Sequence, residues 1–192
     1  MSIGTDEPKT AKSATALYNP NQGGTAMKQE IERKWRLNRL PALASCADPV
    51  RIRQGYLMTD EGELRIRAKN DECFLTVKGE GDLSRNEWET PIPDWVFQLL
   101  WPKTDGRALE KIRYSLDCGD LTLEFDVYLG RLKDLVILEI EFPDKAAAQA
   151  FEIKYLQFAT NTEAEEVTYD QNFKNKNLAN WLSVQNITTK EE

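Results

Sequence analysis

Histidine is absent from the 192 residues of the chain. This absence excludes serine and cysteine triads of the histidine type, histidine metal sites and histidine general bases. Any catalysis must therefore depend on carboxylates, Lys, Arg and Tyr, together with a metal ion that these groups hold.

Cysteine is scarce. The three cysteines, Cys46, Cys73 and Cys118, are scattered along the chain without CxxC spacing. An odd set of this kind is typical of a reducing compartment and does not build a zinc site. We therefore expect a cytoplasmic protein without structural zinc.

Long apolar runs and an excess of basic residues are also missing. No stretch approaches the ~20 apolar residues that a membrane span needs, so we expect a soluble protein with no membrane partner. The net charge of -7 argues against a general nucleic-acid binder, because such domains usually carry a basic excess.

Composition divides the chain into three parts. Residues 1–26 are rich in Thr, Ala, Pro, Asn and Gly and lack periodicity, which predicts a disordered tail or an upstream extension. An ordered arm packed on the domain is the alternative for this segment. Residues 27–185 suit one domain with a sizeable core, and residues 186–192 are expected to form a flexible tail.

The most informative stretch that is present is Glu30-Ile-Glu-Arg-Lys34. In an extended strand Glu30, Glu32 and Lys34 share one face within about 13 Å. Neighbouring carboxylates repel each other unless a cation intervenes, and an oxygen-ligated divalent ion such as Mg²⁺ is suited to that place. Lys34 adds a point charge suited to a phosphate. The alternative is the solvated face of an edge strand.

The same alternation recurs along the chain and predicts eight strands, most with charges on one face and apolar side chains on the other. They are expected at residues 27–37, 51–58, 63–69, 73–79, 84–90, 109–116, 121–129 and 136–142.

Three helices are also predicted. The first covers residues 95–101, with Asp94 as its N-cap. Its expected apolar stripe consists of Trp95, Val96, Leu99 and Leu100. Asp144 caps a second helix over residues 145–151, and a third, amphipathic helix is expected over residues 170–184.

Eight twisted strands tend to close into a barrel, because closure removes free edges and leaves helices to cover the apolar outside. The predicted fold class is therefore α+β, mainly β: an eight-stranded antiparallel closed barrel with helices packed on the outside. Its charged face would line the interior. The alternative is an open sheet with helices beneath it and a charged outer surface.

The predicted lining carries both signs of charge. Its basic members are Lys34, Arg65, Arg67, Lys78, Arg85, Lys111 and Arg113. Its acidic members are Glu30, Glu32, Glu87, Glu89, Glu124, Asp126, Glu139 and Glu141. Buried unpaired ions are very costly, so a polyanion held by the first set and a divalent metal held by the second would satisfy both. A phosphate chain is the obvious polyanion.

In order and spacing these segments resemble the CYTH domain of the triphosphate tunnel metalloenzymes, of the short bacterial single-domain type, from Met27 to about Ala179. The matching segments are Glu30-Ile-Glu-Arg-Lys34, Gln54-Gly-Tyr-Leu57, Leu64-Arg-Ile-Arg67, Leu75-Thr-Val-Lys78, Arg85-Asn-Glu-Trp-Glu89, Glu110-Lys-Ile-Arg-Tyr114, Glu124-Phe-Asp126, Leu138-Glu-Ile-Glu-Phe142, Glu166-Val-Thr-Tyr-Asp170 and Phe173-Lys-Asn-Lys-Asn-Leu-Ala179. The resemblance implies an eight-stranded tunnel that binds a triphosphate and one or two Mg²⁺ or Mn²⁺ ions.

On this resemblance we expect a metal-dependent triphosphatase that cleaves inorganic tripolyphosphate to pyrophosphate and phosphate. The residues expected to clamp the phosphate chain are Arg65, Arg67, Lys78, Arg85, Lys111 and Arg113. The expected metal ligands are Glu30, Glu32, Asp126, Glu139 and Glu141. The expected catalytic set is Lys34 with Glu30 and Glu32, in which Lys34 orients or deprotonates the attacking water. The partner is a small-molecule triphosphate, and the protein is a monomer or a homodimer.

Other functions stay open at this stage. Within the family these are hydrolysis of thiamine triphosphate or nucleoside triphosphates, and adenylate cyclase activity; each needs an aromatic or apolar surface beside the tunnel that no motif provides. From a different class, the chain could be a polyphosphate or nucleotide sensor without turnover, against which the intact acidic sets argue. An empty clamp is expected to hold unpaired cations. Tyr169 and Gln171 depart from the family's usual residues and predict a differently shaped tunnel mouth.

Overall fold

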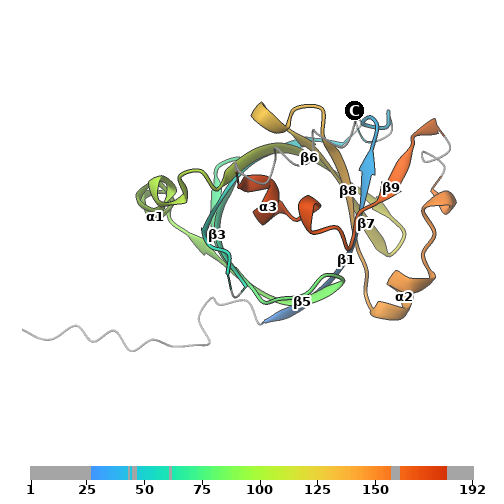
Figure 1. Ribbon diagram of the computed structural model, residues 1–192, viewed down its shortest axis with the longest axis horizontal. Helices are drawn as coiled ribbons and strands as arrows, with labels where there is room; N and C mark the ends of the chain where they lie inside the picture. The colour runs from blue at the N-terminus through green and yellow to red at the C-terminus, as the bar shows by residue number, and fades with distance from the viewer. Residues whose placement is uncertain (1–26, 43, 45–46, 61, 157–160, 181–192) are drawn as a thin grey trace, which may run out of the picture.

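The computed structural model of the chain describes residues 27–42, 44, 47–60, 62–156 and 161–180. The predictions made for residues 1–26, 181–185 and 186–192 lie outside this range. Figure 1 shows a ring of strands, with helices α1 (Asp94–Leu100) and α2 (Lys145–Ala150) on its outside. In the described part of the chain, no helix is long and apolar enough to cross a membrane.

Nine strands form one continuous sheet. They are β1 (Lys28–Leu37), β2 (Pro49–Met58), β3 (Glu63–Lys69), β4 (Glu72–Lys78), β5 (Ser84–Ile92), β6 (Ala108–Cys118), β7 (Leu121–Tyr128), β8 (Val136–Glu141) and β9 (Ala164–Glu166). The first eight correspond to the eight predicted strands, and the short β9 is an addition that the alternation did not indicate.

The sheet closes on itself. Its strand order is β5-β4-β3-β2-β6-β7-β8-β1-β9, and an additional antiparallel pairing of β1 with β5 joins the ends of an eight-stranded ring. One edge of β1 pairs with β5 over its first residues and with β9 over its last. The predicted closed antiparallel barrel is confirmed, and the open-sheet alternative is excluded.

Apolar side chains on the outer face of the barrel form two cores. Ile31, Trp35 and Leu138 belong to one, which α2 and the chain after it cover with Ala148 and Leu156. The N-cap predicted for α2 is confirmed, because the side chain of Asp144 accepts a hydrogen bond from the Ala147 amide at 2.8 Å.

Helix α1 covers the second outer core, but only partly with the predicted face. Phe97 is buried there against Ile66 on β3, and Leu100 packs on the same core as predicted. Trp95 and Leu99 are 68% and 63% exposed, so the predicted stripe is wrong for these two residues. The predicted N-cap is wrong as well: Pro93 occupies that position without a side-chain cap, and Asp94 is the first helical residue.

A 3₁₀ helix, η2 (Trp101–Thr104), follows α1 and packs on β2. It approaches the strand so closely that a Cβ at Gly55 would lie 2.5 Å from the Thr104 hydroxyl oxygen. Only glycine fits at this position, because no side-chain carbon fits at such a distance.

The single helix predicted over residues 170–184 is replaced, within the described residues, by η6 (Gln171–Phe173) and α3 (Asn175–Ala179). Asp170 accepts a hydrogen bond from the Asn172 amide, and the extended backbone of Lys174 separates the two pieces. Figure 1 shows α3 inside the outline of the ring rather than on its outside.

Helix α3 builds an apolar floor across one end of the barrel. Its Leu178 and Ala179 are fully buried in a cluster with side chains that β2, β6, β7 and β8 send inward. These inward side chains are Tyr56, Leu109, Tyr128 and Ile137. The barrel is therefore closed at this end by packed side chains.

Candidate active site

The barrel encloses a cavity of about 190 Å³ whose lining is almost wholly charged. The cations that line it are Lys34, Arg65, Arg67, Lys69, Lys78, Arg85, Lys111 and Arg113. The carboxylates that line it are Glu30, Glu32, Glu87, Glu89, Glu124, Glu139 and Glu141. The amides of Gln54 and Asn175 complete it, so no apolar side chain is among the lining residues of the described chain.

Every predicted site residue except Asp126 lines this cavity. Strand register brings them together: Glu32 on β1 lies opposite Glu141 on β8, and Lys34 lies opposite Glu139. Because alternate residues of a strand share a face, these residues all point inward.

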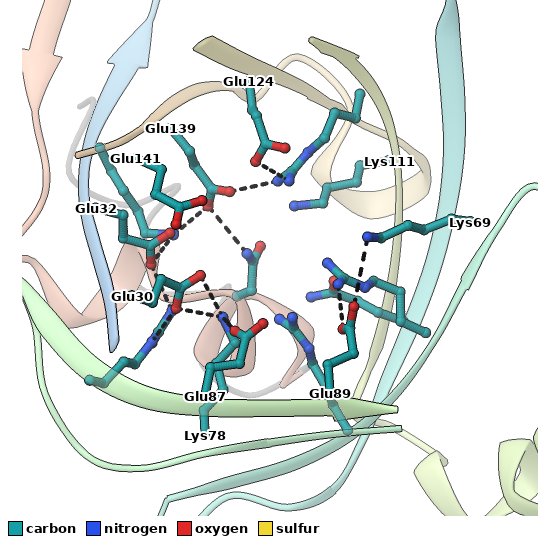
Figure 2. A pocket seen from close by; sticks show the side chains of 17 residues that line it. Glu30, Glu32, Lys69, Lys78, Glu87, Glu89, Lys111, Glu124, Glu139 and Glu141 are labelled. Carbon is teal, nitrogen blue, oxygen red and sulfur yellow. Dashed lines mark hydrogen bonds and ion pairs between the residues drawn. The ribbon is translucent and has the colours of Figure 1, made fainter. Parts of the chain in front are cut away.

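The two signs of charge are partly separated in space. Figure 2 shows the carboxylates of Glu30, Glu32, Glu139 and Glu141 on one side of the cavity, with Lys69 and Lys111 across from them. A phosphate chain lying between the two sides would have Lys69 and Lys111 on one flank and these carboxylates, with the cations paired to them, on the other.

Lys34 lies within the acidic side. Its Nζ is paired with Glu139 and lies 3.2 Å from Glu32, and the side chain is 9% exposed. Burial alone would lower the pKa of Lys34, but the two carboxylates outweigh burial and raise that pKa above its ordinary value. An ammonium held so firmly orients neighbouring groups better than it accepts a proton.

The backbone of Lys34 is fixed by the segment after β9. The Lys34 amide donates to the Thr168 hydroxyl at 3.0 Å, and the Lys34 carbonyl accepts from the Val167 amide at 2.9 Å. Position and direction of this side chain therefore depend on the C-terminal segment as well as on β1.

Arg85 and Lys78 hold the carboxylates at the start of β1. Arg85 donates to Glu30 at 2.9 Å and to Glu32 at 2.6 Å, and Lys78 donates to Glu30 at 2.7 Å. Burial would raise the pKa of Glu30, but Lys78 and Arg85 hold it well below the ordinary range. Arg85 also lies 3.6 Å from Glu63, a buried carboxylate that the sequence did not single out.

Asp126 is fully buried and binds two of the predicted clamp residues. Its carboxylate accepts two hydrogen bonds from Arg113, at 2.7 and 2.6 Å, and is paired with Lys111. Burial lowers the pKa of Lys111 to about 8 against the opposing attraction of Asp126. Asp126 thus lies behind the lining, where it positions Lys111 and Arg113; its predicted role as a metal ligand stays a prediction.

Arg65 and Arg67 on β3 differ from the cations described above, because each has a buried guanidinium donor without a hydrogen-bond partner. The Nε atoms of Arg65 and Arg67 have no hydrogen-bond partner, although both side chains line the cavity and are at least nine-tenths buried. Arg67 is paired with Glu89 at 2.5 Å, whereas no ion pair among the described residues involves Arg65. A buried donor without a partner is costly and indicates an acceptor that binds there.

The expectation of unpaired cations in the empty clamp is therefore wrong for most of them. Lys34, Lys78, Arg85, Lys111 and Arg113 are each paired with a carboxylate of the barrel wall. Cations and carboxylates on neighbouring strands lie close enough to pair, and pairing offsets part of the free-energy cost of burying each charge alone.

The carboxylates of Glu30, Glu32, Glu139 and Glu141 supply oxygen donors, the type that Mg²⁺ and Mn²⁺ prefer. They also lie on one side of the cavity (Figure 2). Within the described chain, however, no three His, Cys, Asp or Glu side chains are already arranged to hold a metal ion. Instead, the carboxylates are paired with Lys and Arg side chains of the barrel. Their oxygens suit a divalent ion once those Lys and Arg side chains bind another group.

Three residues of the lining were not among the predicted lining residues: Lys69, Gln54 and Asn175. Lys69 continues the alternation of Arg65 and Arg67 on β3, which was a usable signal. Gln54 is 1% exposed and leaves its Oε1 without a partner. No local pattern marks Asn175, because it reaches the cavity only through the tertiary position of α3.

Tyr169 and Gln171 lie on the segment that leads to the closed end. Tyr169 is 63% exposed, and Gln171 donates to Asp82 in the turn between β4 and β5 at 2.9 Å.

Comparison with known proteins gives consistent matches. The model of the CYTH domain matches residues 28–173. An inorganic triphosphatase of Nitrosomonas europaea is 46% identical over 153 residues, which cover 78% of this chain and 96% of that protein. An inorganic triphosphatase of Acetivibrio thermocellus is 39% identical over 124 residues, which cover 63% of this chain and 79% of that protein. A crystal structure of an inorganic triphosphatase aligns with a TM-score of 0.57 and 42% identity, covering 78% of this chain and 97% of the other.

Proposed function

Since the chain belongs to the CYTH domain family, we propose that it hydrolyses inorganic tripolyphosphate to pyrophosphate and phosphate with Mg²⁺ or Mn²⁺. The single observation that carries this proposal is that Arg65 and Arg67 each have a guanidinium donor without a partner in the charged cavity of the barrel. Phosphate oxygens are the natural acceptors for such donors, because the planar guanidinium binds them in a fork.

The lining supports a bare polyphosphate as substrate. A nucleoside or a thiazolium would need an aromatic or apolar surface to stack on, and the described lining residues include none. The cavity of about 190 Å³ is also smaller than the roughly 300–1,000 Å³ of pockets for drug-sized ligands. Both features favour tripolyphosphate over thiamine triphosphate or ATP.

The charge balance of the cavity supports a role for divalent cations. Eight cations and seven carboxylates line it, so a polyanion that entered alone would leave a large negative excess in a buried space. Glu30, Glu32, Glu139 and Glu141 are the residues that would hold Mg²⁺ or Mn²⁺. When bound, the metal would neutralise charge on the phosphate oxygens and acidify a water molecule.

The residues of the chain have separate roles in this proposal. Arg65, Arg67 and Arg113 bind the phosphate oxygens, and Lys111 adds a charge beside them. Lys34 orients the attacking water from the acidic side. The apolar floor at α3 keeps bulk water out of that end, which strengthens each electrostatic contact in the cavity.

Phosphate release from tripolyphosphate, ATP and thiamine triphosphate, each with Mg²⁺, with Mn²⁺ or with chelator, tests the proposal. The expected result is release that requires the metal and is fastest with tripolyphosphate. Glu139→Gln, purified in the same way, serves as the control for contaminating phosphatases and should be inactive. Preference for ATP or thiamine triphosphate would point to the alternative hydrolases, and binding of tripolyphosphate without turnover would point to a sensor.

Cytoplasmic location and a monomeric or homodimeric state stay predictions. Fractionation of the source cells and light scattering of the purified chain would test them.

A further inference from the structure

Helix α3 places one neutral side chain, Asn175, among the charges of the cavity. Its Oδ1 accepts a hydrogen bond from the Tyr128 hydroxyl at 2.5 Å, and its Nδ2 donates to Oε1 of Glu139 at 3.5 Å. A carboxylate only accepts hydrogen bonds, so the amide nitrogen must face Glu139 and the amide oxygen must face Tyr128. Tyr128 thus fixes the orientation of Asn175, and Asn175 in turn contacts Glu139.

Asn175 differs in charge from the other side chains that hold Glu139. Lys34 is paired with one oxygen of this carboxylate, and Arg113 donates to the other at 2.6 Å. A bound polyphosphate would compete for Arg113, which the proposed function assigns to the phosphate oxygens, because a guanidinium binds phosphate as well as carboxylate. It would compete far less for a neutral amide. The contact with Asn175 is therefore expected to remain when Arg113 turns to the substrate.

Helix α3, which begins at Asn175, is held by several contacts to the barrel. Lys174 is paired with Asp82 at 2.6 Å and donates to the Gly81 carbonyl at 3.1 Å, both in the turn between β4 and β5. Lys176 donates to the Thr59 carbonyl, after β2, at 3.2 Å. Together with the apolar floor, these contacts hold α3 against two turns at the closed end of the barrel.

We propose that Asn175 is a positioning residue: it fixes the Glu139 carboxylate in the direction in which it binds the divalent cation, and Tyr128 fixes Asn175. This inference rests on the proposed function in so far as it takes Glu139 as a metal ligand. Partners that orient metal-binding side chains typically change metal affinity or activity by about 10- to 100-fold when they are removed.

Metal binding and turnover of the full chain test this role. In Asn175→Ala, calorimetry should show Mn²⁺ binding weakened about tenfold. The Mg²⁺ concentration for half-maximal tripolyphosphate hydrolysis should rise to a similar degree, while KM for tripolyphosphate changes little because the phosphate clamp is intact. Tyr128→Phe should have a smaller effect in the same direction. The double variant should lose no more than Asn175→Ala, because Tyr128 acts through Asn175.

Asn177→Ala is the matched control. It makes the same substitution on the same helix, but the Asn177 amide donates to the Gln171 carbonyl at 2.7 Å and does not line the cavity. It should loosen α3 and lower the melting temperature without changing metal affinity. If Asn175→Ala fails to fold, Asn175→Leu keeps the branched shape without adding a charge and removes the donor to Glu139, and the same loss of metal affinity is expected.

Metal affinity of the wild-type value in Asn175→Ala would overturn the inference. An equal loss in Asn177→Ala, or unchanged metal binding in Asn175→Leu, would overturn it as well. Failure of the proposed function has a different signature: the wild-type chain would release no phosphate from tripolyphosphate. Calorimetry with Mn²⁺ would then still decide whether Asn175 matters to a metal site.

Discussion

Two arginines that line the same cavity should lose different amounts of stability on the same substitution. Arg85 is bound to Glu30 and Glu32 and lies near the buried Glu63, whereas Arg65 has no ion pair among the described residues and an unsatisfied Nε. Arg→Met removes the charge at either position and keeps most of the apolar stem. Comparing the two variants separates charges that stabilise the barrel from charges that bind the substrate.

For Arg85→Met we expect a large loss of stability. Removing one partner of a buried ion pair leaves carboxylates without compensation, which costs about 3–5 kcal/mol. For a chain of this size each kcal/mol lowers the melting temperature by about 2–4 °C, so the shift should be about 6–20 °C. Burial would also raise the pKa of Glu30 once Arg85 no longer offsets it.

Arg65→Met should cost less stability than Arg85→Met in the absence of ligand, because Arg65 forms no close ion pair within the described chain. Its charge is still partly compensated: burial would lower the pKa of Arg65, but Tyr56 and nearby carboxylates such as Glu87 raise it. The main cost of the substitution should appear in binding. A hydrogen bond to a charged group contributes about 1.5–3 kcal/mol, which corresponds to an increase of about 10- to 100-fold in KM for tripolyphosphate.

Thermal melts without ligand and steady-state kinetics of the two variants measure these effects. If Arg65→Met lost as much stability as Arg85→Met, Arg65 would have a structural partner that the ion pairs do not reveal. If its KM were that of the wild type, the orphaned donors would not be a phosphate site. Either result would refute the reasoning.

Four further predictions follow from the same contacts. Lys34→Ala should lower kcat by about 10²-fold with little change in KM, because an orienting ammonium acts mainly in the transition state; a change in KM alone would make Lys34 another phosphate clamp. Glu139→Gln and Glu141→Gln should each abolish metal-dependent turnover in a folded protein, and full activity in both would remove the metal assignment. Tripolyphosphate with Mg²⁺ at about 100 times Kd should stabilise the fold by about 2.7 kcal/mol, so an unchanged melting curve would contradict binding in the cavity. Hydrogen bonds from Arg33 lower the pKa of Glu166 below 4.5, and the charge of Arg67 lowers the pKa of Glu89 below 4.5. The stability that these two carboxylates give the fold should therefore be complete above that pH and be lost as the pH falls below it. Glu166→Gln should reduce this pH dependence in acid melts.

The barrel was predictable because its physical signal is local and repeated. Strict alternation of charged and apolar residues along eight segments fixes which side chains face inward, and only a closed sheet gives so many same-face charges a common interior. The resemblance to the CYTH family is confirmed by the match over residues 28–173 and by the identity to triphosphatases. Where pattern and register agree, as at Glu32 and Lys34, the sequence predicted the lining correctly.

The face of α1 was not predictable in this way. A seven-residue helix has barely two turns, so its apolar residues permit more than one stripe. The choice is made by the sheet beneath it: Phe97 fits against β3 and stacks on Trp101 at 5.2 Å, which leaves Trp95 and Leu99 outside. Tertiary packing thus overrides a weak local preference.

Asn175 was not predictable for a related reason. Its place in the cavity depends on η6, on the break at Lys174 and on the anchoring of α3 to two turns, which are distant in the sequence. A single amide in a short polar segment carries no periodic signal. Residues of this kind emerge only when the closed end of the barrel is known.

Ion pairs among the cavity residues reduce what each cation can contribute to substrate affinity. The ion pairs that stabilise the free barrel, such as Lys78 with Glu30, must loosen before their cations can bind phosphate. Each of these contacts therefore contributes only the difference between two strong interactions. Arg65 should contribute more, because its Nε has no hydrogen-bond partner to give up and it forms no close ion pair within the described chain. Carboxylates released in the exchange become free to bind a divalent cation. Metal and triphosphate should consequently bind with positive coupling, each raising the affinity of the other by the same factor. Calorimetric titration of Mn²⁺ with and without a non-hydrolysable triphosphate would measure that factor, and independent binding of the two ligands would show that the internal ion pairs persist in the complex.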